Sequence, residues 1–261
     1  MLDHAPPFPG DLAEALGFPP AGDRQWDAIA GSGADSVEIK ILLTPGDDTA
    51  ALLSGTHAVR VRHRRLHLLD TVDLALARAG VHLRLRDRGR DRWDLTVRLR
   101  GSGAVAVPDL PRPTGGRVEL DVLPGAVYHS SEVRERVPAG LAIALRDSVL
   151  DPRELLTGPQ AALLAYGVPD LDGELWAHGP LRVERASVPR PRCRLPHARH
   201  ERCRFPGGRV LEEFSARCLP AQAPEVARAS AYLLAAHRLT AAASQRTKTA
   251  VWADELLAGV R

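Results

Sequence analysis

Lysine, aromatic residues and cysteine are all scarce in this sequence of 261 residues. Only two of its 35 basic residues are lysines, Lys40 and Lys248, and the rest are arginines. Aromatic residues make up 4%, which leaves few side chains on which nucleic-acid bases could stack. Three cysteines do not build a disulfide framework in a chain of this length. Nucleic acid is therefore an unfavoured partner, and we expect the thiols to be reduced.

Long apolar runs are also missing. The longest candidate, residues 221–243, is interrupted by Glu225, Arg228, His237 and Arg238, so we expect no membrane span. The sequence does not open with a positively charged segment followed by an apolar stretch, which is the pattern of a secretory signal. These absences predict a cytoplasmic protein without a membrane partner.

Arginine is abundant, and its distribution is uneven. The net charge is only +3, yet arginines crowd a single stretch between residues 60 and 100. Such a density of one charge favours an anionic partner. The arginines of this stretch are Arg60, Arg62, Arg64, Arg65, Arg78, Arg84, Arg86, Arg88, Arg90, Arg92, Arg98 and Arg100.

The chain divides into a short extension and one large domain. Residues 1–33 are rich in Pro, Gly and Ala, and we expect a flexible segment with a short helix near residues 11–17. Residues 34–261 are predicted to form a single domain, mostly of strands, with a helical insert at about residues 130–175. Helical spacing also predicts an amphipathic helix near the C-terminus, over residues 224–243, and a shorter one after it.

Charged and apolar residues alternate in residues 36–41, 81–86, 95–100 and 117–122. Successive side chains of a strand point to opposite faces, so each segment has one charged face and one apolar face. An open sheet could turn the charged face to water, which is the commoner meaning of such alternation. The charged faces here are nearly all arginine with a few carboxylates, and massed arginines repel one another. This composition favours a sheet closed into a barrel around a bound anion.

Several motifs resemble those of one family. Residues 37–40 (VEIK) resemble the opening E-x-E-x-K strand of CYTH domains, and residues 69–86 (LDTVDLALARAGVHLRLR) resemble the family segment YFDTPDLALxRAGxxLRxR. Residues 118–121 (VELD), followed by Pro124-Gly125, resemble the VEVDxxPG step of an actinobacterial branch. Residues 210–218 and 245–249 are similar to the closing strand and late lysine of that branch. The chain thus resembles the CYTH, or triphosphate tunnel, superfamily over residues 36–122 and 181–250.

The resemblance implies an α+β fold, an eight-stranded antiparallel β-barrel with a charged tunnel and with helices packed outside. It also implies a ligand, a small triphosphate or polyphosphate, and a cofactor, Mg²⁺ or Mn²⁺. The expected activity is metal-dependent hydrolysis of inorganic triphosphate or a similar compound. Two alternatives stay open: an inactive tunnel that binds phosphate or polyphosphate, and a class IV-type adenylate cyclase.

The family positions assign roles to particular residues, and all of these assignments are carried over from the resemblance. The expected catalytic residues are Glu38, Lys40, Arg84 and Arg86. The expected substrate-binding residues are Arg62, Arg98, Arg100, Arg185, Arg217 and Lys248. The expected metal ligands are Glu38, Glu119, Asp121 and Glu213.

Two serines depart from the family pattern. Ser36 replaces the first glutamate of the opening strand, and Ser215 stands where a second carboxylate is common on the closing strand. Each change removes one metal ligand, so the number of metals stays open. A structural alternative also stays open, in which Glu38 pairs with Lys40 and the arginines pair with the other carboxylates without touching a ligand.

A group of cysteines and histidines lies outside these motifs. Cys193, His197, His200 and Cys203 fall within eleven residues, and both residue types bind zinc. Their spacing matches no zinc signature, and a strand-loop-strand segment would not bring the four side chains together. Zinc binding is therefore an unfavoured alternative.

Overall fold

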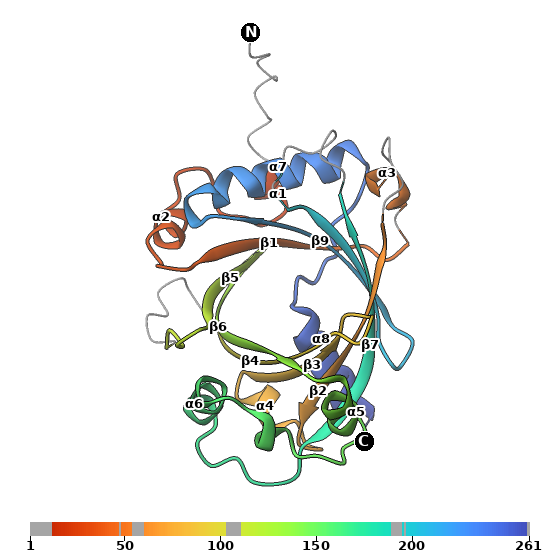
Figure 1. The fold of residues 1–261 in the computed structure, drawn as a ribbon. Helices are drawn as coiled ribbons and strands as arrows, with labels where there is room; N and C mark the ends of the chain where they lie inside the picture. The colour runs from red at the N-terminus through yellow and green to blue at the C-terminus, as the bar shows by residue number, and fades with distance from the viewer. Residues whose placement is uncertain are drawn as a thin grey trace.

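The computed structural model describes residues 12–46, 48–53, 60–102, 111–188, 195 and 197–259. Within these ranges nine strands close into a barrel in the order β1-β5-β6-β4-β3-β2-β7-β8-β9 (Figure 1). The strands are β1 (Ser36–Leu43), β2 (Arg62–Asp70), β3 (Val81–Asp87), β4 (Trp93–Ser102), β5 (Arg117–Leu123), β6 (Ala126–Val137), β7 (Trp176–Ser187), β8 (Arg199–Arg204) and β9 (Val210–Cys218).

The expected barrel with outer helices is confirmed, but two details differ from the expectation of eight antiparallel strands. The described barrel has nine strands, and β1 runs parallel to β5 while every other neighbouring pair is antiparallel. A parallel pair needs a long crossover connection. Here the intervening chain, which includes strands β2 to β4, provides that crossover.

Helices cover two opposite sides of the barrel (Figure 1). On one side α1 (Leu12–Ala15), α2 (Arg24–Ala30) and α7 (Ala223–Ala236) lie over β1, β5 and β9. Val37, Ile39 and Ile41, the apolar face of β1, are fully buried there. On the other side α4 (Ala75–Arg78), α5 (Ala139–Arg146) and α6 (Gly158–Gly167) cover β3 and β4. The apolar side chains therefore point outward into these two layers, and the charged ones point into the lumen.

The remaining elements are α3 (Ala50–Leu53), the 3-10 helices η1 (Pro152–Leu155) and η3 (Pro220–Gln222), and α8 (Lys248–Gly259). None of the helices in the described ranges combines the length and apolar character that crossing a bilayer demands.

Two boundaries differ from the sequence-based expectation. The helical insert expected at about residues 130–175 begins only at Ala139, because β6 continues to Val137. Helix α2 lies inside the segment expected to be a flexible extension. Asp23 caps this helix by accepting the N–H of Gln25, and Trp26 and Ile29 are buried in the core.

The turn between β2 and β3 is fixed by a buried carboxylate. Asp70 accepts the backbone N–H groups of Thr71, Leu76 and Ala77, at 2.8, 2.9 and 2.9 Å. Gly80 then closes the turn with a positive φ of 76°, and a Cβ there would lie 2.6 Å from the carbonyl oxygen of Arg100. This turn is the segment that carries the strongest family resemblance, and it sets the register of the arginine-bearing strand β3.

Candidate functional site

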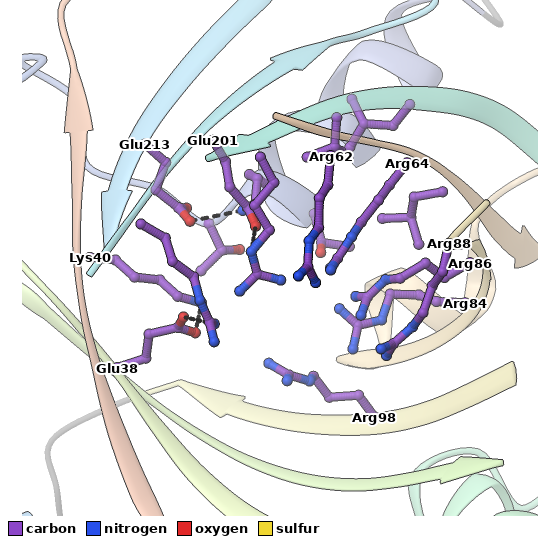
Figure 2. Close-up of a pocket in the computed structure, with 18 of the residues that line it drawn as sticks. Glu38, Lys40, Arg62, Arg64, Arg84, Arg86, Arg88, Arg98, Glu201 and Glu213 are labelled. Carbon is purple, nitrogen blue, oxygen red and sulfur yellow. Dashed lines mark hydrogen bonds and ion pairs between the residues drawn. The ribbon is translucent and has the colours of Figure 1, made fainter. Parts of the chain in front are cut away.

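The lumen holds a cavity of about 410 Å³ whose lining is overwhelmingly cationic. Fifteen cationic and three acidic side chains line it, all from the described residues. Figure 2 shows the labelled arginines of β2 and β3 pointing into the cavity opposite Glu38 and Lys40. The cations are Lys40, Arg60, Arg62, Arg64, Arg84, Arg86, Arg88, Arg98, Arg100, Arg117, Arg134, Arg185, Arg199, Arg217 and Lys248, and the acids are Glu38, Glu201 and Glu213.

Glu132 on β6 is the centre of an ion-pair network on one side of the lumen. Its carboxylate lies 2.5 Å from Arg98 Nη2, 3.0 Å from Arg84 Nη2, 2.7 Å from Arg117 Nη2 and 2.6 Å from Arg134 Nη2. The side chain is 1% exposed. Burial alone would raise its pKa, but the surrounding arginines outweigh burial and hold the pKa well below its usual range. Four arginines thus share one carboxylate and favour its ionised form.

Asp121 on β5 holds a second set of cations. It lies 2.8 Å from Lys40 Nζ, 2.6 Å from Arg100 Nη2 and 3.5 Å from Arg98 Nη1, and it is fully buried. Lys40 also lies 3.2 Å from Glu38 on its own strand. Glu119 on β5 lies 2.9 Å from Arg98 Nη2. We call seven residues of these ion-pair networks the paired wall: Glu38, Lys40, Arg98, Arg100, Glu119, Asp121 and Glu132.

The opposite side of the lumen carries Arg62 and Arg64 from β2 and Arg86 from β3, which we call the arginine wall. No acidic side chain of the described residues forms an ion pair with any of the three. Burial lowers the pKa of Arg64 and of Arg86 to about 10, and neighbouring guanidinium groups add to the effect. Both groups stay charged near neutral pH. The arginine wall therefore carries positive charge that the described protein does not neutralise.

Buried donors without acceptors face the same cavity. Nε of Arg84, Nε of Arg134, Nε of Arg217 and Nε1 of Trp252 are buried and have no hydrogen-bond partner among the described residues. A buried donor left unpaired costs free energy, so native structures usually supply a partner. All four groups are N–H donors, and phosphate oxygens are acceptors. The cavity therefore has the hydrogen-bonding character of an anion site.

Both lysines of the chain lie between two carboxylates. Lys40 contacts Glu38 and Asp121, while Lys248, at the start of α8, contacts Glu201 and lies 2.8 Å from Glu213. Burial would lower the pKa of Lys248, but the two glutamates hold it well above its usual range. Two carboxylates thus hold each ammonium group in place at the cavity lining.

The four expected metal ligands are separated by side-chain cations. Lys40 lies between Glu38 and Asp121, Arg217 bridges Glu38 and Glu119, and Glu213 contacts Lys248. Within the described ranges no group of three His, Cys, Asp or Glu side chains is arranged to hold a metal.

A single Mg²⁺ needs fewer than three protein ligands, because it takes one or two carboxylates and completes its coordination shell with water and substrate phosphate. Glu201 and Glu213 are register partners on β8 and β9, and both face the cavity. This pair fits one such ion, whereas Glu119 and Asp121 lie behind the cavity lining among arginines.

The zinc alternative finds no support in the described part of the chain. His200 bonds to Glu212 at 3.0 Å, and Cys203 packs in an apolar cluster where burial raises its thiol pKa. Zinc binds the thiolate, so a raised pKa opposes it. His197 is exposed, and Cys193 lies outside the described residues.

The structure brings together every residue expected to bind substrate and every residue expected to be catalytic, since all of them line the cavity. Their roles stay predictions. Glu132, the most connected carboxylate of the site, was not anticipated, because its strand falls in the range expected to be helical. Arg64 and Arg134 were also missed as site residues, although the alternation of a strand places each of them two positions from another charged lumen residue.

The closed barrel has a lumen lined mostly by cationic side chains, a charge distribution suited to an anion. No family model matches the chain, and no curated protein matches it. Solved structures do share the fold. A candidate adenylyl cyclase from Hippeastrum, HpAC1, described as having a dominant triphosphatase activity, is 17% identical over 84% of this chain and 95% of its own, with a TM-score of 0.58. A candidate adenylate cyclase from Bacillus halodurans is 13% identical over 82% of this chain and 95% of its own, with a TM-score of 0.55.

At these identities the likeness concerns the fold. The chain shares its barrel fold with these two structures, in agreement with the barrel that the sequence resemblance implied.

Proposed function

We propose that this chain binds a small triphosphate, such as inorganic triphosphate, in its tunnel and hydrolyses the terminal anhydride bond. The observation that carries this proposal is the arginine wall, whose charges have no acidic partner among the described residues. A multiply charged anion would neutralise these arginines and accept hydrogen bonds from the unpaired donors. The fold likeness to a protein with dominant triphosphatase activity supports the same substrate class.

Hydrolysis would proceed by attack of water on the terminal phosphorus while the bond to the bridging oxygen breaks. Arg64, Arg86 and Lys40 would hold the phosphate oxygens and stabilise the charge that develops on them. Burial opposes ionisation of Glu38, but Lys40 and other cations outweigh it and lower the pKa of Glu38 to about 2. So acidic a carboxylate is a weak base, and its role is to orient the water.

A divalent ion would be held by Glu201 and Glu213, together with phosphate oxygens of the substrate. Mg²⁺ or Mn²⁺ bound there supplies charge that polarises the phosphoryl group. Lys248 already contacts both carboxylates, so it would move from between them toward the phosphate chain. Within the described residues this pair replaces the four-residue metal set that the family positions suggest.

The proposal is tested by two measurements on the purified protein. Calorimetry measures binding of inorganic triphosphate, and a phosphate-release assay with Mg²⁺ or Mn²⁺ measures turnover of inorganic triphosphate and ATP. We expect both binding and release. Tight binding without release would replace hydrolysis by phosphate or polyphosphate binding, and cyclic AMP formed from ATP would replace it by cyclase activity.

Neighbouring arginines of β2 provide a matched pair of variants. Arg64 lines the cavity, while Arg65 points outward, is 61% exposed and pairs with Asp87. Arg64→Gln is expected to weaken triphosphate binding by about tenfold or more, since the charged hydrogen bonds of one guanidinium are lost. Arg65→Gln should leave binding unchanged. Equal effects of the two variants would show that only bulk charge matters and would overturn the tunnel as the site.

A further inference from the structure

A second hollow lies on the outside of the barrel, on the face of β2, β7 and β8 that points away from the lumen. We call it the outer groove, and it has a volume of about 630 Å³. Figure 1 shows β7 on a side of the barrel between the helical layer of α1, α2 and α7 and that of α4, α5 and α6. The lining of the outer groove includes two carboxylates and five arginines, which are Arg64, Arg65, Arg182, Arg202 and Arg204.

Three of these arginines form a row across the strands. Arg65 of β2 is the register partner of Arg182 of β7, and Arg182 is the register partner of Arg204 of β8. All three side chains are exposed. Like charges directly opposite one another destabilise an antiparallel sheet. The stability of the sheet therefore does not explain this row.

The two carboxylates of the outer groove neutralise only part of this charge. Asp87 lies 3.3 Å from Nε of Arg65. Glu184, the other carboxylate of the lining, forms no ion pair with a residue that the structure describes. Within the same ranges Arg182 and Arg204 form no ion pair either. Two neighbouring guanidinium groups are therefore available to bind an anion.

The composition of the outer groove favours a phosphate chain over nucleic acid. None of the described residues that line it is aromatic, so bases would have no side chain on which to stack. The guanidinium groups of the row stand on adjacent strands, which lie about 5 Å apart. Arginine binds phosphate oxygens through two parallel hydrogen bonds. Charge complementarity therefore points to an anion with many closely spaced phosphate groups.

The outer groove and the lumen cavity lie on opposite faces of one strand pair. Arg64 of β2 and Val183 of β7 are register partners, and both contribute to the lining of the two hollows. Arg65 and Arg182 are the next partners along the pair, and they line the outer groove only. The sheet itself therefore separates the outer row from a ligand in the tunnel.

We propose that the outer groove is a second anion site, which binds long-chain inorganic polyphosphate through Arg65, Arg182 and Arg204. This site does not depend on hydrolysis in the tunnel. Exposed ion pairs contribute little one by one, so a short triphosphate binds the outer groove weakly. A long chain contacts the whole row at the same time and binds through several contacts together.

A double variant tests the outer row. Calorimetry measures binding of long-chain polyphosphate without metal, while a saturating amount of inorganic triphosphate occupies the tunnel. Arg182→Gln combined with Arg204→Gln removes two exposed charges, and we expect the affinity to fall by about fivefold or more. The matched control combines Arg24→Gln with Arg228→Gln, which removes the same charge from exposed positions of α2 and α7 and should leave the affinity unchanged.

Several outcomes of this experiment would overturn the second site. Equal losses in the two double variants would show that only the net charge of the protein matters. Absence of long-chain binding in the presence of triphosphate would show that the tunnel is the one place where the chain binds. Tighter binding of single-stranded DNA or of polyglutamate, lost in the same double variant, would show that the ligand is not polyphosphate.

Two further measurements separate the outer groove from the tunnel and from the fold. Binding and turnover of inorganic triphosphate should be the same in the Arg182→Gln, Arg204→Gln protein and in the unmodified protein, because both arginines lie outside the lumen. If the unmodified protein does not bind inorganic triphosphate, the proposed function fails, while long-chain polyphosphate still tests the outer groove. The double variant should be at least as stable as the unmodified protein, since it loses facing like charges. A clear loss of stability would show that these arginines serve the fold, and the second site would be rejected.

Discussion

The two walls of one lumen use the same residue type for different purposes. On the paired wall, Arg98 contacts Glu119, Asp121 and Glu132, and its surroundings hold its pKa above the ordinary value for arginine although burial opposes this. On the arginine wall, Arg86 has no acidic partner among the described residues, and its pKa is lowered to about 10. The protein therefore stabilises the charged form of Arg98 and destabilises the charged form of Arg86.

This difference distinguishes arginines that stabilise the barrel through ion pairs from arginines that are available to bind an anion. The charge of a buried cation is already neutralised when several carboxylates surround it, so it attracts a further anion only weakly. A buried cation that forms no ion pair with a carboxylate gains more when an anion binds. Of the expected substrate-binding residues, Arg98 and Arg100 belong to the first class, while Arg62 is exposed and lacks an ion-pair partner among the described residues.

The largest effect should come from removing the centre of the paired wall. Glu132→Gln leaves four buried or half-buried arginines without their shared carboxylate, and we expect it to lower the free energy of unfolding by about 3–5 kcal/mol. Chemical denaturation measures the loss. Glu135→Gln, on the same strand but exposed, serves as the control and should change stability by less than about 0.5 kcal/mol. Similar small effects of both variants would contradict the structural role of the paired wall.

The arginine wall should respond in the opposite manner. Arg86→Gln removes a buried charge that is repelled by its neighbours, so we expect stability to be unchanged or higher. Triphosphate affinity should fall by about tenfold or more, since charged hydrogen bonds to the ligand are lost. Denaturation and calorimetry on the same preparation check both parts, with exposed Arg182→Gln as the control. A marked loss of stability in Arg86→Gln would mean that the two walls do not differ.

The sequence alone predicted most residues of both walls as site residues, but not which of them form ion pairs. Alternation in residues 81–86 placed Arg84 and Arg86 on one face, and the family resemblance placed that face in a tunnel. Pairing partners could not be predicted in this way. Arg84 and Arg98 meet Glu132 only because β3, β4 and β6 lie side by side in one register, which is a property of the closed barrel.

Strand β6 could not be predicted from the sequence pattern, and the reason is physical. Its middle residues Ser130, Ser131 and Glu132 are all buried, so polar and apolar residues do not alternate there. Helical spacing predicted a short helix near the C-terminus, but not that Val251 and Trp252 of α8 would pack with leucines of the strands, such as Leu42. A local sequence pattern indicates which face of a strand or helix is polar and which is apolar. It does not indicate which distant strand or helix packs against that face.

A smaller effect, dependent on pH, should come from Glu38 at the edge of the paired wall. The folded state lowers its pKa from the ordinary value of 4.5 to about 2, so its ionisation stabilises the fold above about pH 4.5. That contribution is lost as the pH falls toward 2. We expect the unmodified protein to lose more stability than Glu38→Gln between these values, measured by denaturation across the range. Parallel curves for the two proteins would remove Glu38 from the ion-pair network.

The smallest effect should come from Arg134, where the two walls meet. Its side chain is 29% exposed, and Glu132 keeps three other arginines without it, so Arg134→Gln should lower stability by less than about 1 kcal/mol. Triphosphate affinity should fall about twofold to threefold, because a half-exposed charge is screened by solvent. In a double-mutant cycle, adding Arg134→Gln to Glu132→Gln should cost nothing further, since the shared carboxylate is already gone. A full additive loss would show that Arg134 stabilises the barrel through other contacts, and the division between the walls would then have to be drawn elsewhere.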